Sequence, residues 1–488
     1  MSEQLIDNQE AENNLLACAT FLAEKIGSSD GHAEAMKELL PYYLAKNEVD
    51  TAAELADSIE DPFTRDQLLV TVAEKCAELD DDEYALQLAD ALEDKSFQGV
   101  CLEGIVRQKA LKKQFEKALE IADKLEHGSN AYAEIAVQQE KAEGLQTADK
   151  IELPYTKVHV LQEISNSSGD TDVLDKALKI TEEIEFEEER IRSYLGIAFQ
   201  FIEFNRKDRA IEVLDKARQF AETHDSVQKD SFLSQISQGF MKAGSIDLAD
   251  RTLDLVEDKY EIAQTLVGYA GEYWAKKEEE DALEALDEAY EILKSQRDTE
   301  TRNSKAKFNL FGIMAVRFAE YGKLERAIEI ANENRYDEIR SNVLTQIAII
   351  CETKGNDDLA HQAIKDIEDN SEKSFAMIAL SDVHRKNEQP EEALKLLNEA
   401  YVTIGTIQQL SMKSGLLNRF AERFNLLDNS SKARQICSEN LQVIYGILDE
   451  SHRVSAMAGL ADTFELLKFE LNDADKEILR TLIRKTAW

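Results

Sequence analysis

The sequence contains few of the residues that interrupt helices. Of its 488 residues only 4 are proline and 19 are glycine, and aromatic residues make up 7%. Proline breaks the hydrogen bonding of a helix interior, and glycine costs about 1 kcal/mol there relative to alanine. Ala, Leu, Glu, Lys and Ile fill the remainder, so the composition predicts a largely helical chain.

Long apolar runs are also missing. No stretch of about 18 apolar residues occurs, so we expect no membrane insertion. The first seven residues are acidic and lack the basic and then apolar pattern of a secretory signal. The predicted localisation is therefore cytoplasmic.

Cysteine is scarce, and its five copies form no Cys-x-x-Cys pair. Cys76 and Cys351 occupy the same place in the repeat described below, and Cys437 falls on a packing face. We interpret them as small buried hydrophobic residues, not as disulfides or metal ligands.

Basic residues are outnumbered by acidic ones, 57 to 97, which gives a net charge of −40. Such a charge repels phosphate backbones, so we do not expect nucleic acid as a partner. It favours solubility and would attract a basic partner.

Recognisable catalytic motifs are absent as well. There is no P-loop, dinucleotide-binding glycine motif or His-Glu-x-x-His. The one Gly-x-Ser-x-Gly match, at 27–31, follows a predicted helix and lacks the preceding strand that a hydrolase nucleophile requires. We therefore expect no catalytic residue, no cofactor and no metal site.

What the sequence does contain is a repeat. Ala52, Leu55, Ala56 and Ile59 have the spacing of one helix face, and the same pattern returns 33 residues later at Ala85. Eight of the twelve steps between successive copies equal 33 residues, and a period of this size is typical of a helical-hairpin solenoid. The anchor positions are Ala19, Ala52, Ala85, Ala118, Gly144, Ala177, Ala210, Ala249, Ala282, Ala327, Ala360, Ala393 and Ala433.

A second helix precedes each anchor. We name the anchor helix B and the helix before it A. Helix A repeatedly carries a small residue twelve positions before the anchor, as at Ala198 and Ala315, and an aromatic residue nine before it, as at Phe201 and Phe318. This pattern resembles the tetratricopeptide (TPR) repeat. The resemblance implies an all-α, right-handed TPR-like α-solenoid of about 13 helical-hairpin units with a C-terminal capping helix.

The predicted solenoid is one continuous domain over residues 1–488, with local irregularities. The step from Ala118 to Gly144 is only 26 residues, so its helix A must be short, and a kink in the superhelix is expected near 126–154. Steps of 39 and 45 residues predict longer helices near 217–230 and 289–307. A looser copy of the repeat at Ala474 belongs to the predicted C-terminal cap at 451–488.

A cation stands twenty residues before most anchors. Near a helix N-terminus it opposes the macrodipole, so it needs a partner. Ion pairs between repeats are the structural interpretation, and a basic stripe that grips an acidic ligand is the functional one. This basic ladder consists of Arg65, Lys157, Arg190, Lys229, Lys307, Arg340, Lys373 and Lys413.

In TPR-like arrays the A helices line the concave face. In the middle repeats, the A-helix positions that the resemblance places on this face are apolar. Apolar residues on an open surface suggest a groove for a helix or an extended peptide. The alternative is that a tightly coiled superhelix buries them. The candidate partner-binding residues are Leu195, Phe199, Ile202, Met241, Val267, Trp274, Val316 and Ile349.

These observations favour a non-catalytic scaffold or adaptor that binds another protein or peptide in its central concave groove. One alternative is a regulatory subunit that controls an associated protease, kinase or nuclease. Another is an acidic chaperone for a basic cargo. Repeat arrays serve many processes, so the sequence does not name the partner.

Overall fold

The computed structural model describes residues 5–224, 226–296 and 304–486, and the helices account for most of them. No β-strand occurs in these ranges. No helix in them is both long and apolar enough to cross a bilayer. The first element is the short helix α1 (Asn8–Ala11), and one 3₁₀ turn, η1, covers Ile404–Thr406.

The remaining helices alternate between the two predicted kinds. The A helices are α3 (Ser29–Ala45), α5 (Pro62–Glu78), α7 (Lys95–Leu111), α9 (Ser129–Gln138), α11 (Pro154–Ser168), α13 (Glu187–Glu203), α15 (Lys229–Ala243), α17 (Lys259–Ala275), α19 (Ser304–Glu320), α21 (Asp337–Thr353), α23 (Asn370–Lys386), α25 (Leu410–Leu426) and α27 (Glu450–Leu467). The B helices are α2 (Leu15–Glu24), α4 (Val49–Asp57), α6 (Asp82–Ala91), α8 (Phe115–Ala122), α10 (Lys141–Ala148), α12 (Asp172–Thr181), α14 (Lys207–Thr223), α16 (Ile246–Leu253), α18 (Glu279–Ser295), α20 (Leu324–Asn332), α22 (Asp357–Asp366), α24 (Pro390–Thr403), α26 (Ser430–Gly446) and α28 (Asp473–Thr486).

Each anchor residue lies in a B helix, and every anchor alanine from Ala19 to Ala433 has no exposed surface. The small side chain lets helices A and B of one hairpin approach closely, while the larger apolar residues around it exclude water. Paired in chain order from α3 with α4 to α27 with α28, the helices make thirteen hairpins. The prediction of an all-α repeat solenoid is confirmed.

The turn from helix A to helix B follows the same repeat. Five residues before most anchors the backbone has a positive φ, for example at Asn47, Asn205 and Gly244. Asparagine and glycine adopt this left-handed conformation at low cost and commonly end helices. The turn therefore recurs with the same period as the packing contacts.

The structure comprises two compact units. Unit 1 contains Met1–Ile105 together with Leu344–Trp488, and unit 2 contains Val106–Val343. The boundaries fall inside the A helices α7 and α21. The single continuous solenoid over 1–488 therefore stays a prediction.

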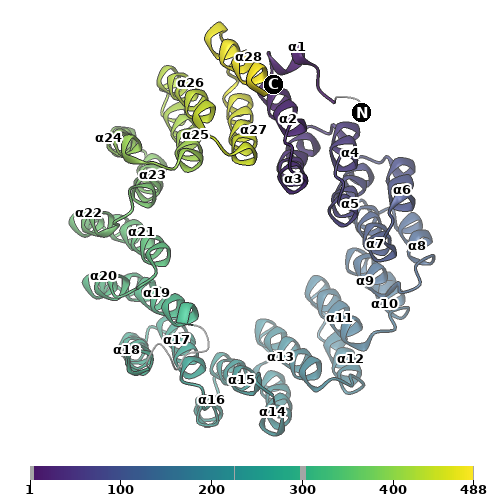
Figure 1. Ribbon diagram of the computed structural model, residues 1–488. Coiled ribbons are helices and arrows are strands. Elements are labelled where there is room, and N and C mark those ends of the chain that lie inside the picture. The colour runs from purple at the N-terminus through teal and green to yellow at the C-terminus, as the bar shows by residue number, and fades with distance from the viewer. Residues whose placement is uncertain (1–4, 225, 297–303, 487–488) are drawn as a thin grey trace. The chain divides into compact units, whose positions relative to one another are not determined.

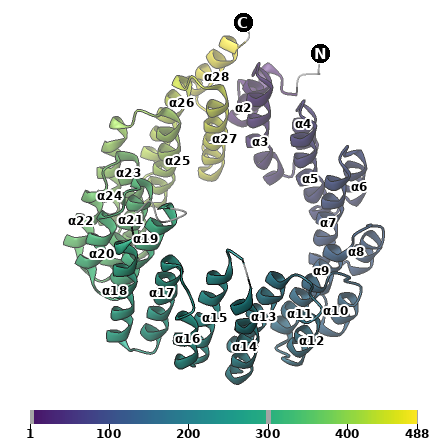
Figure 2. The same ribbon diagram turned by 60° about the horizontal axis from the view of Figure 1, so that its bottom comes forward.

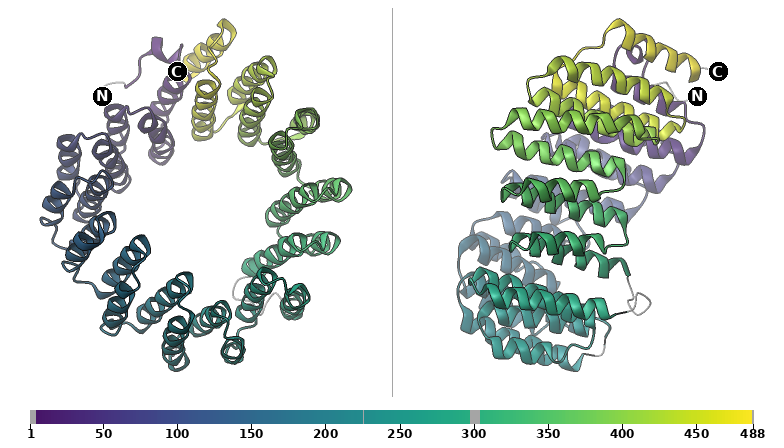
Figure 3. Two further views of the ribbon diagram at one scale, coloured as in Figure 1. Left: turned by 180° about the vertical axis from the view of Figure 1, so that it is seen from behind. Right: turned by 90° about the vertical axis from the view of Figure 1, so that its left-hand side faces the viewer.

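Unit 1 contains both ends of the chain, and these ends pack on each other. Helix α27 lies against α2 and α3, and α28 contacts α26, α2 and α1. Figures 1 and 3 show the purple N-terminal helices beside the yellow C-terminal ones. Lys46 pairs with Glu465 at 2.7 Å and Arg480 pairs with Glu12 at 3.1 Å. The helices predicted as a C-terminal cap, 451–488, thus have the first helices of the chain as neighbours.

The looser anchor in the last helix was placed one residue too early. Ala474 is exposed, and the neighbouring Asp475 is buried. Its carboxylate accepts hydrogen bonds from Ser438 (3.0 Å) and from the guanidinium of Arg434. The apolar face of α28 consists of Leu479, Leu482 and Ile483. The polar N-terminal turn of α28 therefore bonds to α26 through a buried carboxylate, which the apolar pattern did not reveal.

In unit 2 the A helices form one row and the B helices a second row behind it, as α11, α13 and α15 show with α12, α14 and α16 (Figures 1 and 2). Helix α9 has only 10 residues, whereas α13 has 17, as the short repeat step requires. Whether the superhelix kinks there stays a prediction. The long steps are taken up by B helices of 17 residues, α14 and α18. Residues 297–303 of the longer helix predicted near 289–307 lie outside the described part of the chain.

Candidate partner-binding surface

The predicted groove residues do not share one degree of exposure. Leu195, Met241 and Val267 are buried, so they do not form an open surface as predicted. The other five are partly exposed, and Ile349 among them belongs to unit 1, apart from the other seven. These three are covered where neighbouring A helices pack side by side, and Met241 and Val267 also line the pocket described next. The partly exposed residues are Phe199, Ile202, Trp274, Val316 and Ile349.

A pocket of about 530 Å³ lies on the A-helix row of unit 2, among α15, α17 and α19. Its apolar wall includes Met241, Val267 and Trp274. The indole of Trp274 stacks on the ring of Tyr321, with centroids 4.0 Å apart and planes 14° from parallel. The Tyr321 hydroxyl donates to the carbonyl of Ala270 at 3.3 Å, which fixes the ring. We call this the aromatic pocket.

The aromatic pocket has a mixed charged rim. Lys242, Glu272, Arg317 and Glu320 all line it. Arg317 pairs with Glu320 at 2.8 Å within α19, and this exposed pair is worth little to stability. An apolar wall with a polar rim is the common anatomy of a protein-binding site.

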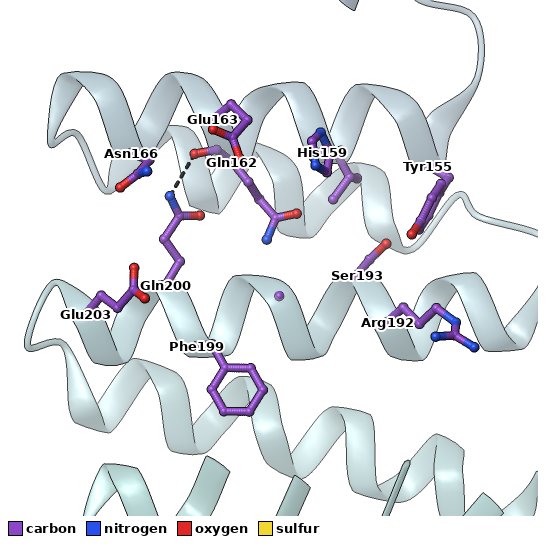
Figure 4. Close-up of a pocket in the computed structure, with 12 residues that line it drawn as sticks. Tyr155, His159, Gln162, Glu163, Asn166, Arg192, Ser193, Phe199, Gln200 and Glu203 are labelled. Carbon is purple, nitrogen blue, oxygen red and sulfur yellow. Dashed lines mark hydrogen bonds between the residues drawn. The ribbon is translucent and has the colours of Figure 1, made fainter. Parts of the chain in front are cut away.

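A second pocket of about 330 Å³ lies between α11 and α13, and most of the residues that line it are polar. Figure 4 shows His159 and Gln162 on one helix and Ser193 and Gln200 on the other. The side-chain amide of Gln200 donates to the carbonyl of Gln162 at 2.7 Å. We call this the polar pocket.

The two pockets adjoin through one contact. Phe199 lines the polar pocket and Lys242 lines the aromatic pocket. The Lys242 ammonium lies 5.5 Å from the centroid of the Phe199 ring, which is cation–π distance. A bound chain could therefore cross both pockets along the row of A helices.

Two buried polar atoms of the polar pocket have no hydrogen-bond partner. They are the hydroxyl oxygen of Ser193 and the amide oxygen of Gln200, in side chains that are 3% and 8% exposed. Leaving such an atom unsatisfied costs about 1–3 kcal/mol. Most buried polar atoms in folded proteins are paired, so these two call for an explanation.

Glycines on the A helices leave space for polar side chains of the preceding A helix. The amide nitrogen of Gln162 rests on Gly196 of the next A helix, where an added Cβ would lie 2.6 Å from it. Gln238 rests on Gly268 and Glu74 on Gly104 in the same way. These glycines stand fourteen residues before the anchors of their repeats. That spacing was readable from the sequence, but it acquires meaning only once the facing helix is known.

The ladder cations make two kinds of contact, and Arg340 makes both, because it also pairs with Asp337 at 2.9 Å. Arg65 pairs with Glu93 at 2.8 Å and Lys157 with Asp149 at 3.3 Å. Four further ladder cations donate to the end of the preceding B helix or to the turn after it. The acceptors are backbone carbonyl oxygens, of Ile184 for Arg190 (2.9 Å), Gln296 for Lys307 (2.6 Å), Asn334 for Arg340 (3.4 Å) and Lys365 for Lys373 (3.4 Å).

These four cations thus donate to carbonyl oxygens near the negative end of a neighbouring helix dipole. Lys229 and Lys413 are partly exposed. A role of the ladder in gripping an acidic ligand stays a prediction.

The cysteines have the character that the sequence predicts. All five are free and buried. Burial raises the pKa of the Cys101 thiol to about 12, so it stays protonated and unreactive at neutral pH. Within the described ranges no three His, Cys, Asp or Glu side chains gather as a metal site would require.

No protein-family model matches this sequence, and the search of curated proteins found no match. Among solved structures, aspartyl phosphate phosphatase F from Bacillus subtilis is 14% identical over 87% of this chain and 96% of that one, with a TM-score of 0.30. The Cut9–Hcn1 hetero-tetramer of APC/C is 11% identical over 91% and 92%, with a TM-score of 0.24. The TPR-like repeats of a kinesin light chain from Podosopora anserina are 16% identical over 46% and 100%, with a TM-score of 0.24.

Proposed function

We propose that this chain is a non-catalytic scaffold or adaptor that binds a segment of a partner protein on the A-helix row of unit 2. The observation that carries the proposal is the aromatic pocket. A partly exposed tryptophan, stacked on a fixed tyrosine and surrounded by a charged rim, has the composition of a binding hot spot. The polar pocket beside it extends the surface.

We place this protein in the cytoplasm as part of the same proposal. Five free cysteines suit a reducing compartment, where disulfides are rare. Control of an associated enzyme by the bound chain would be a special case of the same binding.

The test is capture of partners from native lysate by the tagged full chain, followed by mass spectrometry. Trp274→Ala and Phe199→Ala, singly and together, should lower recovery of the partner at least tenfold while the helical circular dichroism stays unchanged. The matched control is Phe186→Ala, which removes a 69% exposed aromatic side chain from the start of α13.

Recovery that depends only on salt, and not on Trp274, would contradict the proposal. It would instead indicate that basic proteins bind the net charge of −40. Loss of helical content in the Trp274 variant would show that the indole serves folding, and partner binding would then have to be tested with Phe199→Ala alone.

A further inference from the structure

The polar pocket contains two unpartnered atoms on one face of one helix. Ser193 and Gln200 are seven residues apart on α13, which is about 10 Å along the helix axis. In Figure 4 both side chains extend from α13 into the gap that faces α11. A ligand that satisfied both atoms would have to extend along the helices.

The floor of the pocket between these two atoms already holds a carboxamide. The side chain of Gln162 lies across Gly196, where the absence of a Cβ leaves the space for it. Figure 4 shows the Gln162 side chain extending from α11 toward α13. The site between Ser193 and Gln200 is therefore shaped for an amide group, and the flexible Gln162 side chain can swing away from it.

The two ends of the pocket differ in charge. Glu163 and Glu203 lie at one end, and Arg192 with His159 lies at the other (Figure 4). The Arg192 guanidinium also donates to the side chain of Gln228, so an acidic ligand would have to share it or displace that bond. Neither carboxylate has an ion pair with a described cation. Helices α11 and α13 run in the same direction, so the positive ends of both dipoles lie near Arg192 and add to the difference.

The span between the charges sets the length of a ligand. Arg192 and Glu203 are eleven residues apart on α13, or about 16 Å. An extended peptide covers this distance with about five residues at roughly 3.3 Å each. A uniformly acidic or uniformly basic segment would meet repulsion at one end.

We propose that the polar pocket recognises an extended peptide segment of about five residues that is basic at one end and acidic at the other. The basic side chain lies beside Glu163 and Glu203, and the acidic one lies beside Arg192. The main-chain amides between them replace the Gln162 carboxamide and give partners to Ser193 and Gln200. This inference rests on the proposed function and adds the chemistry of the partner.

The experiment selects random heptapeptides, displayed on phage, against the full chain. The enriched peptides should carry one basic and one acidic residue about four positions apart. A synthetic, fluorescently labelled copy of an enriched peptide should bind at least tenfold more weakly to the double variant Glu163→Lys with Glu203→Lys, as measured by anisotropy. The control double variant, Glu143→Lys with Glu183→Lys, makes the same charge change near the B helices and should bind normally.

Enrichment without this charge pairing, absence of any enriched peptide, or equal binding by both double variants would overturn the inference. The partner-capture experiment distinguishes failure of this inference from failure of the proposed function. If Trp274→Ala still abolishes capture while the selected peptides show no charge pairing, the scaffold function stands and only the partner chemistry is wrong.

Discussion

At the residue scale, local electrostatics explain why cations recur twenty residues before most anchors. The ladder cations lie near the N-termini of their own helices, where they oppose the dipole. Arg190 illustrates why they are tolerated, because its guanidinium donates to the carbonyl of Ile184, just beyond the end of helix α12. The sequence predicted that such cations need partners, but it could not distinguish a carboxylate partner from a carbonyl partner.

The left-handed turn residue is another case that sequence reasoning passed over. Lys277 and Glu388 occupy the same position as Gly244 and Gly355, five residues before an anchor, with φ values of 66° and 60°. Neither residue type favours this conformation, so propensity alone gives no signal there. Only the period of the repeat would have revealed these positions.

Glu261, near the start of α17, gives a pH prediction at this scale. Burial, together with the nearby carboxylates of Asp258 and Asp230, raises the pKa of Glu261 above 4.5. Since the charged form is disfavoured in the folded chain, Glu261→Gln should increase the free energy of unfolding at pH 7. The increase should stay below about 1 kcal/mol, because the carboxylate is only half-buried and water screens it.

The sign of the pH dependence follows from the direction of the shift. A raised pKa means that the wild type gains stability as the pH falls through the folded pKa toward 4.5. The advantage of Glu261→Gln should therefore disappear over that window in urea denaturation. A constant advantage down to pH 4 would contradict this explanation, and Glu183→Gln, at an exposed site, should show no such trend.

At the element scale, the period predicted the helices because one small residue per hairpin sets how closely two helices approach. The alternation of A and B helices and the short α9 were all readable in this way. Gly144 is the exception among the anchors. A Cβ there would lie 2.6 Å from the backbone carbonyl oxygen of Ala136, so the short helix α9 approaches α10 too closely for alanine.

We expect Gly144→Ala to destabilise the chain by about 1–3 kcal/mol, because a backbone atom must move to admit the methyl group. This would be the reverse of the usual effect of replacing glycine inside a helix. Urea denaturation of the full chain measures the change.

The matched control is Gly415→Ala in α25, where an added Cβ meets no atom within 4 Å. This variant should be stabilised by up to about 1 kcal/mol, as helix propensity requires. Equal effects of the two substitutions would show that the close approach at Gly144 is not the reason for its glycine.

The binding surface was less predictable than the helices. The resemblance placed apolar residues on the A helices, and Trp274 does line a pocket. The burial of Leu195, Met241 and Val267 depends on how closely successive A helices pack, which the pattern within one repeat does not specify. The stacking of Trp274 on Tyr321 joins two repeats separated by the 45-residue step, so no fixed spacing could reveal it.

At the scale of the whole molecule, the packing of the chain ends in unit 1 is the feature that the sequence did not reveal. A repeat pattern reports contacts between neighbours along the chain. The contact of α2 with α27 joins elements at opposite ends of the sequence. The cap predicted at 451–488 carried no indication that the first helices of the chain would pack against it.

This packing predicts that the two ends stabilise each other. Deleting residues 2–28, which carry α1 and α2, should remove hydrogen-exchange protection from α27 and lower the urea midpoint. Helix α15 in unit 2 is the internal control, and its amides should exchange at the wild-type rate. Unchanged protection of α27 in the deletion variant would contradict a stabilising role for the contact.

The same contact imposes an order on synthesis. Nine of the ten residues of α2 are buried in the finished fold, but α27 is made more than 400 residues later. At about 5–20 residues per second, the ribosome needs roughly 20–80 s to complete that interval. During this time the apolar faces of α2 and α3 that α27 later covers are without that neighbour. A nascent chain of this protein would therefore expose these apolar faces of α2 and α3 to other proteins until α27 has been synthesised.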